Sequence, residues 1–429
     1  MKNTLIDKLI DFIDNSTSMF HANKNVAEIL NRNGFKELNL GLPWKLEQGD
    51  KYYVSMNDSA IIGFIINSTN IEEEGFRLVG THTDFPGFKV KPNANMRGNS
   101  YVKLNTEIYG GPILNTWLDR PLSLAGRVSI KSSDILNPIN HLVDFRNPIL
   151  VIPNLAIHMN REQNNGVKLN PQKETLPILA YVKETLESDL LIELISEELN
   201  INKDDILSFD LYLYPTEKGQ IIGLKKQFIS ASRLDNLSMT FSAIHGIINS
   251  KSNKGISILV CFDNEEVGSR TKQGAYSPFL VNCLEKICLG LNKTREMFLQ
   301  SLYYSFMISA DVAHLLHPNY PEKSDPTNKI LAGNGIAIKS AARFSYTTDS
   351  DSHAVMANLC KTNNIPYQTF VNRSDERGGS TIGPITSSYL GMRSVDIGTP
   401  ILSMHSAREL MACEDFIHTC NVLLAFYNI

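Results

Sequence analysis

The pattern of apolar and polar positions predicts α/β segments at both ends of the chain. Near the N-terminus, apolar residues recur every three to four positions in LIDKLIDFIDN and NVAEILNRNGF, which predicts two amphipathic helices. The runs YYVSM and AIIGFII follow, with Asn57-Asp58 between them, and predict two neighbouring strands. Phe76 to Val79 predicts a further strand, which runs directly into His82, Thr83 and Asp84.

The middle of the chain has a different pattern. From about Lys89 to Phe228, short β-like segments alternate with Pro, Gly, Asn and Asp: SYVKLNTEIYG, SLAGRVSIKS, NPILVIP and FDLYLYPT. One long stretch, LPILAYVKETLESDLLIELISEEL, has the period of a helix. We therefore expect residues 89–228 to form an inserted β-rich domain, flanked by residues 1–88 and 229–429 of a first domain.

The α/β pattern returns at about Ile229. DNLSMTFSAIHGIINS predicts a helix, and GISILVCFDNEEVGSR predicts a strand buried on both faces, as in a parallel sheet, that ends in Asp263, Glu265 and Glu266. SLYYSFMISAD is an apolar run ending in Asp311, and ARELMACEDFIHTCNVLLAFY predicts a final helix. The expected fold class is α/β, with a mixed, mostly parallel sheet flanked by helices.

Composition narrows the class of protein. The chain has 429 residues, which suggests at least two domains, and its 42% hydrophobic and 20% charged residues are typical of globular proteins. A net charge of −4 favours neither nucleic acid nor an anionic membrane as a partner, and no apolar run is long enough to span a bilayer. Asp7, Asp11 and Asp14 exclude a signal-peptide core. The six cysteines are scattered without a CxxC pair, which indicates buried free thiols in a reducing cytoplasm rather than a cysteine zinc site.

Five positions at strand ends or in loops carry candidate chemistry: His82, Asp235, the pair Glu265-Glu266, Asp311 and His405. Taken singly, each has an ordinary explanation, such as a solvated acidic turn, a hydrogen-bonded histidine or a helix cap. Together, two histidines and several carboxylates are the ligands expected of a two-zinc hydrolytic site with a bridging carboxylate and a general base.

The motifs around these residues resemble the M18 family of metallo-aminopeptidases, and in particular the bacterial members of its aspartyl aminopeptidase group. They are STSMFHA (16–22), GTHTD (80–84), YGGPILNTWLDRPLSLAGRV (109–128), IPNLAIH (152–158), SRLDNL (232–237), DNEEVGS (263–269), SADVAHLLHPNY (309–320), GSTIGP (379–384) and MHSARE (404–409). Each motif is short, but the eight from residue 80 onward occur in the order of the family.

The resemblance implies a dinuclear zinc peptidase-like fold and a role for each candidate. His82 and Asp311 would bind one metal ion, Asp235 would bridge to the second, and Glu266 and His405 would complete the second. Glu265 would be the general base. Asp84 would hydrogen-bond the other nitrogen of His82 and fix its tautomer. Two Zn²⁺ ions per subunit are expected, although Co²⁺ or Mn²⁺ could take their place.

Four further residues are implied to bind substrate. His158, in IPNLAIH, would reach the active site of a neighbouring subunit, or else be a structural histidine of the inserted domain. Lys339 would suit an acidic substrate side chain, or else be a solvated surface lysine. His317 and the loop at Gly379 would shape the pocket. The stretch PEKSDPTNKILAGNG lacks the histidines that many family members carry there.

The expected function is a cytoplasmic aminopeptidase that removes one N-terminal residue, Asp or Glu, from short peptides. The family forms a tetrahedral dodecamer built from dimers, so the inserted domain is expected to serve dimerisation and oligomerisation. Two alternatives stay open at this point: hydrolysis of N-acyl or C-terminal amides by the same two metals, and a non-catalytic assembly protein with a degenerate site. The complete set of ligand types counts against a degenerate site.

Overall fold

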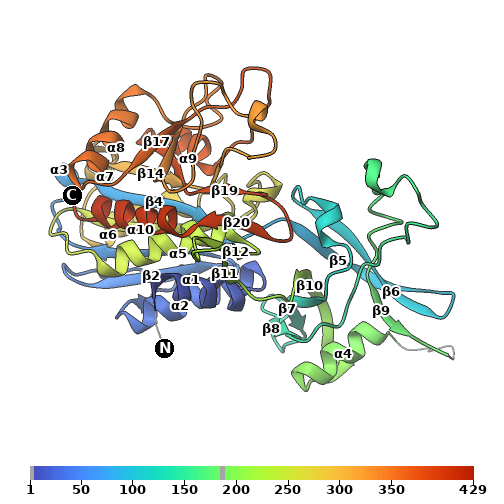
Figure 1. Cartoon of the computed structure of the whole chain (residues 1–429). Helices are drawn as coiled ribbons and strands as arrows, with labels where there is room; N and C mark the ends of the chain where they lie inside the picture. Colours follow the sequence, from blue (N-terminus) through green and yellow to red (C-terminus); the bar gives the residue numbers. More distant parts are fainter. Residues whose placement is uncertain (1–3, 184–188) are drawn as a thin grey trace.

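The computed structural model describes residues 4–183 and 189–429. Its largest sheet is a nine-stranded mixed sheet (Figure 1). In spatial order its strands are β1 (Lys36–Glu37), β2 (Lys51–Met56), β3 (Ala60–Ile66), β13 (Ile256–Phe262), β4 (Phe76–His82), β14 (Phe306–Ala310), β18 (Arg393–Gly398), β16 (Ile336–Lys339) and β17 (Tyr367–Phe370). The central strands β13, β4, β14 and β18 are parallel, and β3 is antiparallel to both of its neighbours. The predicted mixed, mostly parallel sheet is confirmed.

Helices cover both faces of this sheet. One face packs against α1 (Leu5–Asn15), α2 (Met19–Arg32), α5 (Leu234–Asn249), α8 (Ser350–Thr362) and α10 (Cys413–Tyr427). The other packs against α6 (Phe279–Gly290), α7 (Arg295–Tyr303) and α9 (Ile382–Leu390). Every residue of β13 is buried, which explains its unbroken apolar run. Each large aliphatic side chain buried there contributes roughly 1.5–3 kcal/mol of hydrophobic stabilisation.

A second sheet of six antiparallel strands lies to one side of this body (Figure 1). Its strands, in spatial order, are β8 (Ile139–Asp144), β7 (Leu122–Ile130), β10 (Ile206–Pro215), β5 (Gly87–Gly98), β6 (Tyr101–Tyr109) and β9 (Ile178–Tyr181), and α4 (Leu190–Leu199) packs on it. Helix α2 contacts this sheet: the Arg127 guanidinium lies 4.5 Å from the centre of the Phe20 ring. The chain therefore changes sheet near Gly87 and after Pro215.

A third sheet joins segments that are far apart in the sequence. Its order is β11 (Gln220–Ile222), β12 (Phe228–Ala231), β20 (Glu409–Ala412), β19 (Pro400–Leu402) and β15 (Ala313–His314). Ala231 of β12 pairs with Glu409 of β20, so the start of α5 lies beside the loop between β19 and β20. Because β11 pairs with β12, the segment from Gln220 onward belongs with this third sheet. The division into domains at residues 89 and 228 stays a prediction.

Two secondary-structure predictions are wrong. Ile178–Tyr181 forms strand β9 rather than the start of a long helix, because it completes the edge of the six-stranded sheet against β6. Residues 184–188 of that expected helix lie outside the described residues, and in the described remainder of the segment α4 is the helical part. Glu409–Ala412 is strand β20, held between β12 and β19, so the final helix begins at Cys413. The ordinary explanation of Asp311 as a helix cap does not apply, because the next element along the described chain is the short strand β15.

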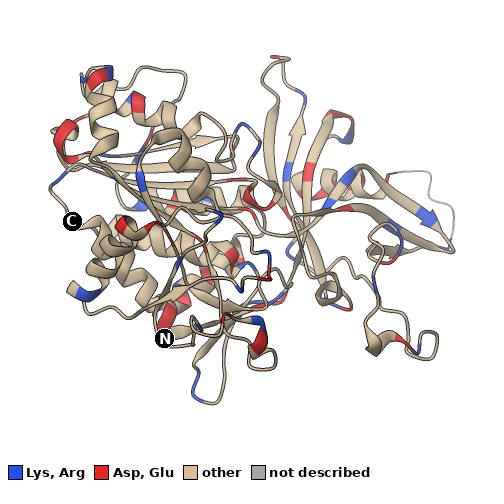
Figure 2. Cartoon of the chain, turned by 90° about the horizontal axis from the view of Figure 1, so that it is seen from above, with Lys and Arg blue, Asp and Glu red and all other residues tan. Residues whose placement is uncertain are grey.

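The surface carries charges of both signs. Figure 2 shows basic and acidic residues interspersed over the body and over the six-stranded sheet. Within the described ranges, no helix has both the length and the apolar character needed to cross a membrane. The short helical turns are α3 (Ile71–Glu74), η1 (Leu114–Trp117), η2 (Gln163–Asn165), η3 (Lys203–Asp205), η4 (Glu265–Val267) and η5 (Pro321–Lys323).

Candidate active site

The carboxyl ends of three neighbouring parallel strands supply most of the candidate residues. His82 is the last residue of β4, Asp311 directly follows β14, and Glu265 and Glu266 lie in the turn η4 after β13. Because β13, β4 and β14 are adjacent and parallel, their ends meet at one edge of the sheet, which is where open α/β sheets bind ligands.

The third sheet adds the two remaining candidates. Asp235 lies in the first turn of α5, just after β12, and His405 lies in the loop between β19 and β20. The pairing of β12 with β20 brings these two segments together at the same edge. All five candidate positions thus meet in one place, although they are dispersed from residue 82 to residue 405.

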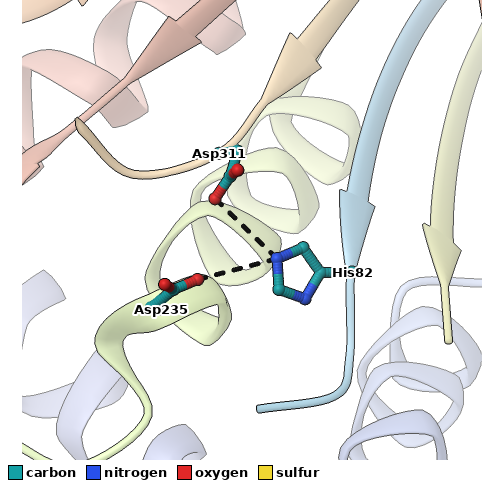
Figure 3. Close-up of side chains that lie close together, drawn as sticks. All are labelled: His82, Asp235 and Asp311. Atoms are coloured by element: carbon teal, nitrogen blue, oxygen red, sulfur yellow. Dashed lines mark ion pairs between the residues drawn. The ribbon is translucent and has the colours of Figure 1, made fainter. Parts of the chain in front are cut away.

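One group of ligand atoms surrounds His82 (Figure 3). The Nε2 atom of His82 lies 3.6 Å from Oδ1 of Asp235 and 3.8 Å from Oδ1 of Asp311. Its Nδ1 atom is hydrogen-bonded to the backbone oxygen of Asp84 at 3.0 Å. That bond places a proton on Nδ1 and leaves Nε2 with a lone pair directed at the two carboxylates, as a metal ligand requires.

A second group surrounds His405. Its Nε2 atom lies 3.4 Å from Oδ2 of Asp235 and 3.5 Å from Oε2 of Glu266, and its Nδ1 atom is 3.0 Å from the backbone oxygen of Gly111. Asp235 therefore presents one carboxylate oxygen to each group. Its buried Oδ1 atom has no hydrogen-bond partner among the described residues. A buried, unpartnered carboxylate oxygen is costly, and a cation at this point would satisfy it.

The electrostatics of the site also fit divalent cations. Burial, followed by repulsion from Asp311 and other acids, raises the pKa of Glu265 to about 8. Burial and repulsion from Asp235 raise the pKa of Glu266 well above its usual value. Positive charge among these carboxylates would offset their mutual repulsion and favour their ionised forms. Three overlapping groups of side chains have ligand atoms that all lie within 4.8 Å of one another: His82–Asp235–Asp311, His82–Glu265–Glu266 and Asp235–Glu266–His405. Imidazole and carboxylate ligands suit zinc.

Asp84 makes contacts beyond the one expected of it. Its carboxylate lies 3.4 Å from Nδ1 of His82, but it also accepts hydrogen bonds from the backbone N–H groups of Glu265 and Glu266, each at 3.1 Å. Tyr109 donates a further hydrogen bond to it at 2.8 Å. Asp84 thus orients both the imidazole and the turn that carries the two glutamates.

The residues expected to bind substrate are dispersed. Lys339 and Gly379 line the same cleft as the candidate ligands, which has a volume of about 820 Å³. Lys339 is 2% exposed: its Nζ atom lies 3.8 Å from Asp311 and donates to the backbone oxygen of Val312 at 3.2 Å. It is therefore not a solvated surface lysine. Despite burial, Lys339 and His82 lower the pKa of Asp311 to about 2.

His317 and His158 lie outside that cleft. His317 lines a neighbouring cavity of about 370 Å³, which shares His314 and Gly379 with the cleft. His158 is exposed, in a loop that follows the bridge between Val151 and Ile178, and among the described residues it is not one that lines the cleft.

Sequence reasoning missed Glu409. This carboxylate is 3% exposed, and it accepts hydrogen bonds from the backbone N–H of Asp235 at 3.0 Å and of His405 at 2.8 Å. Burial and the nearby Asp235 raise its pKa to about 8. The only signal in the sequence was its place at the end of MHSARE, four residues after His405.

Comparison with known proteins identifies the family. Residues 12–427 match the family model described as aminopeptidase I zinc metalloprotease (M18). The chain belongs to the M18 family of zinc metallo-aminopeptidases. It is 51% identical over 433 residues to a relative in Clostridium novyi (strain NT) described as a probable M18 family aminopeptidase 2, with full coverage of both chains. The inferred resemblance to this M18 family, and the metallo-exopeptidase activity that it implied, are confirmed.

Solved M18-family structures share the fold. The subunit in the cryo-EM structure of the Ape4 and Nbr1 complex superposes with a TM-score of 0.95 at 35% identity, over 99% of this chain and 85% of that chain. The S. cerevisiae mApe1 dodecamer superposes with a TM-score of 0.85 at 26% identity, over 98% of this chain and 95% of that chain. The similarity therefore extends over both the nine-stranded and the six-stranded sheets.

Proposed function

We propose that this M18 aminopeptidase binds two zinc ions at the strand ends and hydrolyses short peptides with Glu265 as its general base. His82 and Asp311 would hold the first ion, Glu266 and His405 the second, and Asp235 both. The observation that supports this most directly is the position of Asp235, whose two oxygens lie 3.6 Å and 3.4 Å from two different histidines. A carboxylate in that position could contribute one oxygen to each of two metal ions.

The residues around the ions account for the remaining chemistry. When bound, the two ions would lower the pKa of a water molecule and polarise the scissile carbonyl. Glu265 would accept a proton from that water, whose oxygen forms the new bond to the carbonyl carbon. As the C–N bond breaks, Glu265 would pass the proton to the leaving amine. Asp84, through its hydrogen bonds to the Glu265 and Glu266 backbone, would hold the base in place.

Preference for an N-terminal Asp or Glu belongs to the same proposal. Lys339 is a cation that lines the cleft beside Asp311, and its ammonium group lies 5.0 Å from the centre of the Tyr346 ring. An acidic substrate side chain would find its countercharge there. Hydrolysis of N-acyl or C-terminal amides uses the same two-metal chemistry and is the second candidate, which the substrate panel below separates.

We further propose that the subunit works in a dodecamer built from dimers, in the cytoplasm. The six-stranded sheet, within the expected inserted domain 89–228, would make the contacts between subunits, and His158 would reach the cleft of a neighbour. The mApe1 dodecamer with which this fold superposes supports the assembly. The exposed position of His158 agrees with a role outside its own subunit.

The test of the proposed function combines a substrate panel with metal removal. The zinc-loaded protein should release p-nitroaniline from Glu- and Asp-p-nitroanilide faster than from Leu-p-nitroanilide, and leave N-acetylated versions intact. Removal of metal by a chelator should abolish the activity, and zinc should restore it. Glu265→Gln should retain two zinc ions per chain and lose at least about 100-fold in kcat.

Three outcomes would contradict the proposal. Full activity in the metal-free protein would exclude metal catalysis, and an unchanged kcat in Glu265→Gln would place the base elsewhere. Faster cleavage of the N-acetylated substrates would favour the second candidate.

A further inference from the structure

The catalytic cleft contains one basic side chain that the proposed chemistry does not use. Among the described residues that line the cleft, the lysines and arginines are Lys339 and Arg270. Lys339, buried beside Asp311 and hydrogen-bonded to the backbone oxygen of Val312, is already assigned to the first residue of the substrate by the proposed function. Arg270 is exposed, and within the described chain no carboxylate lies within ion-pair distance of it. Its guanidinium lies 5.7 Å from the centre of the Tyr276 ring, which lines the same cleft.

Resting on the proposed function, we propose that Arg270 forms a subsite for the carboxylate of the leaving part of a short peptide. The substrate class is a dipeptide with a free C-terminus, whose second residue carries that carboxylate next to the leaving amine. A guanidinium is suited to this ligand because its planar donors match a carboxylate in two parallel hydrogen bonds. Stacking on Tyr276 would hold the guanidinium without using those donors.

The position of Arg270 relative to Glu265 gives the direction of the peptide. Glu265 passes its proton to the amine of the second residue, so the second residue has to lie on the Glu265 side of the cleft. The segment that follows Glu265, from Val267 to Arg270, lines the cleft together with Tyr276. Lys339 and Tyr346 come from other elements and stand with Asp311, where the first residue would bind. The two cations thus suit the two ends of one dipeptide.

Arg377, which has no ion-pair partner among the described residues, provides the alternative. Arg377 lines the neighbouring cavity, where Lys323 is paired with Glu376 at 2.7 Å and Arg373 with Asp375 at 2.7 Å. The acids of the segment before GSTIGP are therefore neutralised locally. That cavity meets the cleft at His314 and Gly379, and Glu265 does not line it. A leaving carboxylate placed there would be separated from the base, so the geometry favours Arg270.

The experiment compares Glu-Leu with Glu-Leu-amide, two substrates that differ in the leaving carboxylate. With the zinc-loaded full chain, kcat/KM for the acid should exceed that for the amide by about 10-fold or more, as expected for a hydrogen-bonded charge pair. Arg270→Gln should bring the ratio close to one by lowering kcat/KM for the acid alone. Lys272→Gln is the matched control, since it removes one nearby positive charge that does not line the cleft. It should leave the ratio unchanged.

Two outcomes would overturn the subsite. Arg270→Gln could lower kcat/KM equally for both substrates. Alternatively, Arg377→Gln rather than Arg270→Gln could bring the ratio of the two kcat/KM values close to one. Glu-p-nitroanilide, which has no leaving carboxylate, separates this inference from the proposed function. If the wild-type protein cleaves the anilide but shows no preference between acid and amide, only the subsite fails. If it cleaves none of the three, the proposed function fails.

Discussion

At the scale of single residues, Glu409 is a buried carboxylate that ties together two segments carrying proposed ligands. Its two oxygens accept hydrogen bonds from the backbone N–H groups of Asp235 and His405. In Glu409→Gln, one oxygen becomes an NH₂ group that cannot accept, so one of these N–H groups loses its partner. We expect the affinity for the second zinc ion to fall by about 10- to 100-fold, as for other groups that orient ligands.

The measurement is zinc content and affinity by titration of the metal-free variant, with far-UV circular dichroism to confirm the fold. Glu414→Gln is the matched control, because Glu414 is exposed and follows the same strand, β20. An unchanged affinity for both ions in Glu409→Gln would show that its two hydrogen bonds are not needed to hold the site.

Residue by residue, the sequence predicted those parts of the site that follow from local pattern. His82, Glu265 and Asp311 each come at the end of an apolar run, so a buried strand leading to a polar end was visible. The burial of Lys339 and the two hydrogen bonds of Glu409 were not visible, because both depend on neighbours that lie far away in the sequence. Asp84 was expected to contact His82, but its bonds to the Glu265-Glu266 turn depend on the alignment of β4 with β13.

At the scale of elements, α2 carries a histidine at its contact with the six-stranded sheet. His21 lies beside Ser18, which caps this helix, with its Nδ1 atom 2.8 Å from the Ser18 hydroxyl. Burial, and then Lys24 and Arg146, lower the pKa of His21 to about 4, against the raising effect of Asp144. The folded state therefore favours the neutral imidazole of His21.

Because the pKa of His21 is lower in the folded state, this histidine makes the protein less stable as the pH falls. Between pH 6.5 and 4 the unfolded chain protonates His21 and the folded chain does not, so protonation favours unfolding. The stability linked to the neutral ring is present in full above pH 6.5 and is lost as the pH falls toward 4. We expect a loss on the order of 2 kcal/mol from this group. Urea unfolding of His21→Asn at pH 7 and pH 4.5 should show a smaller difference than wild type.

The comparison with wild type cancels effects of metal loss at low pH, and His353→Asn on α8 controls for histidine replacement elsewhere. Equal pH dependence in His21→Asn and wild type would contradict the assignment.

Elements were predictable where local periodicity decides them. The helices α1, α2 and α5 and the strands β2, β3 and β13 all follow from pattern alone, with Asn57 and Asp58 both at positive φ in the turn between β2 and β3. Strands β9 and β20 did not, because their residues also fit a helix and only pairing with distant strands decides between the two. The same distant pairing hides the third sheet from sequence reasoning.

At the scale of the whole molecule, large apolar side chains remain exposed on the part built around the six-stranded sheet. Ile135 is 95% exposed, Leu136 88%, Met159 75% and Tyr181 65%. The proposed assembly would bury side chains of this kind between subunits. Light scattering should therefore give a mass close to that of twelve 48.0 kDa chains.

The double variant Ile135→Lys/Leu136→Lys should reduce that mass, because it places two charges on the expected contact, while zinc content per chain stays the same. Lys131→Gln, a polar replacement at the end of the neighbouring strand β7, serves as the control. A wild-type mass of a single chain would refute the assembly.

The proposed metal ligands lie far apart along the chain, and this affects when the site can form during translation. The proposed ligands are collected from β4, α5, η4, the end of β14 and the loop before β20, and His405 is the last to emerge from the ribosome. A nascent or prematurely terminated chain that lacks it has no complete second metal position. The peptidase would therefore be inactive during translation. Neither an incomplete nascent chain nor a truncated chain could hydrolyse the peptides of the cell.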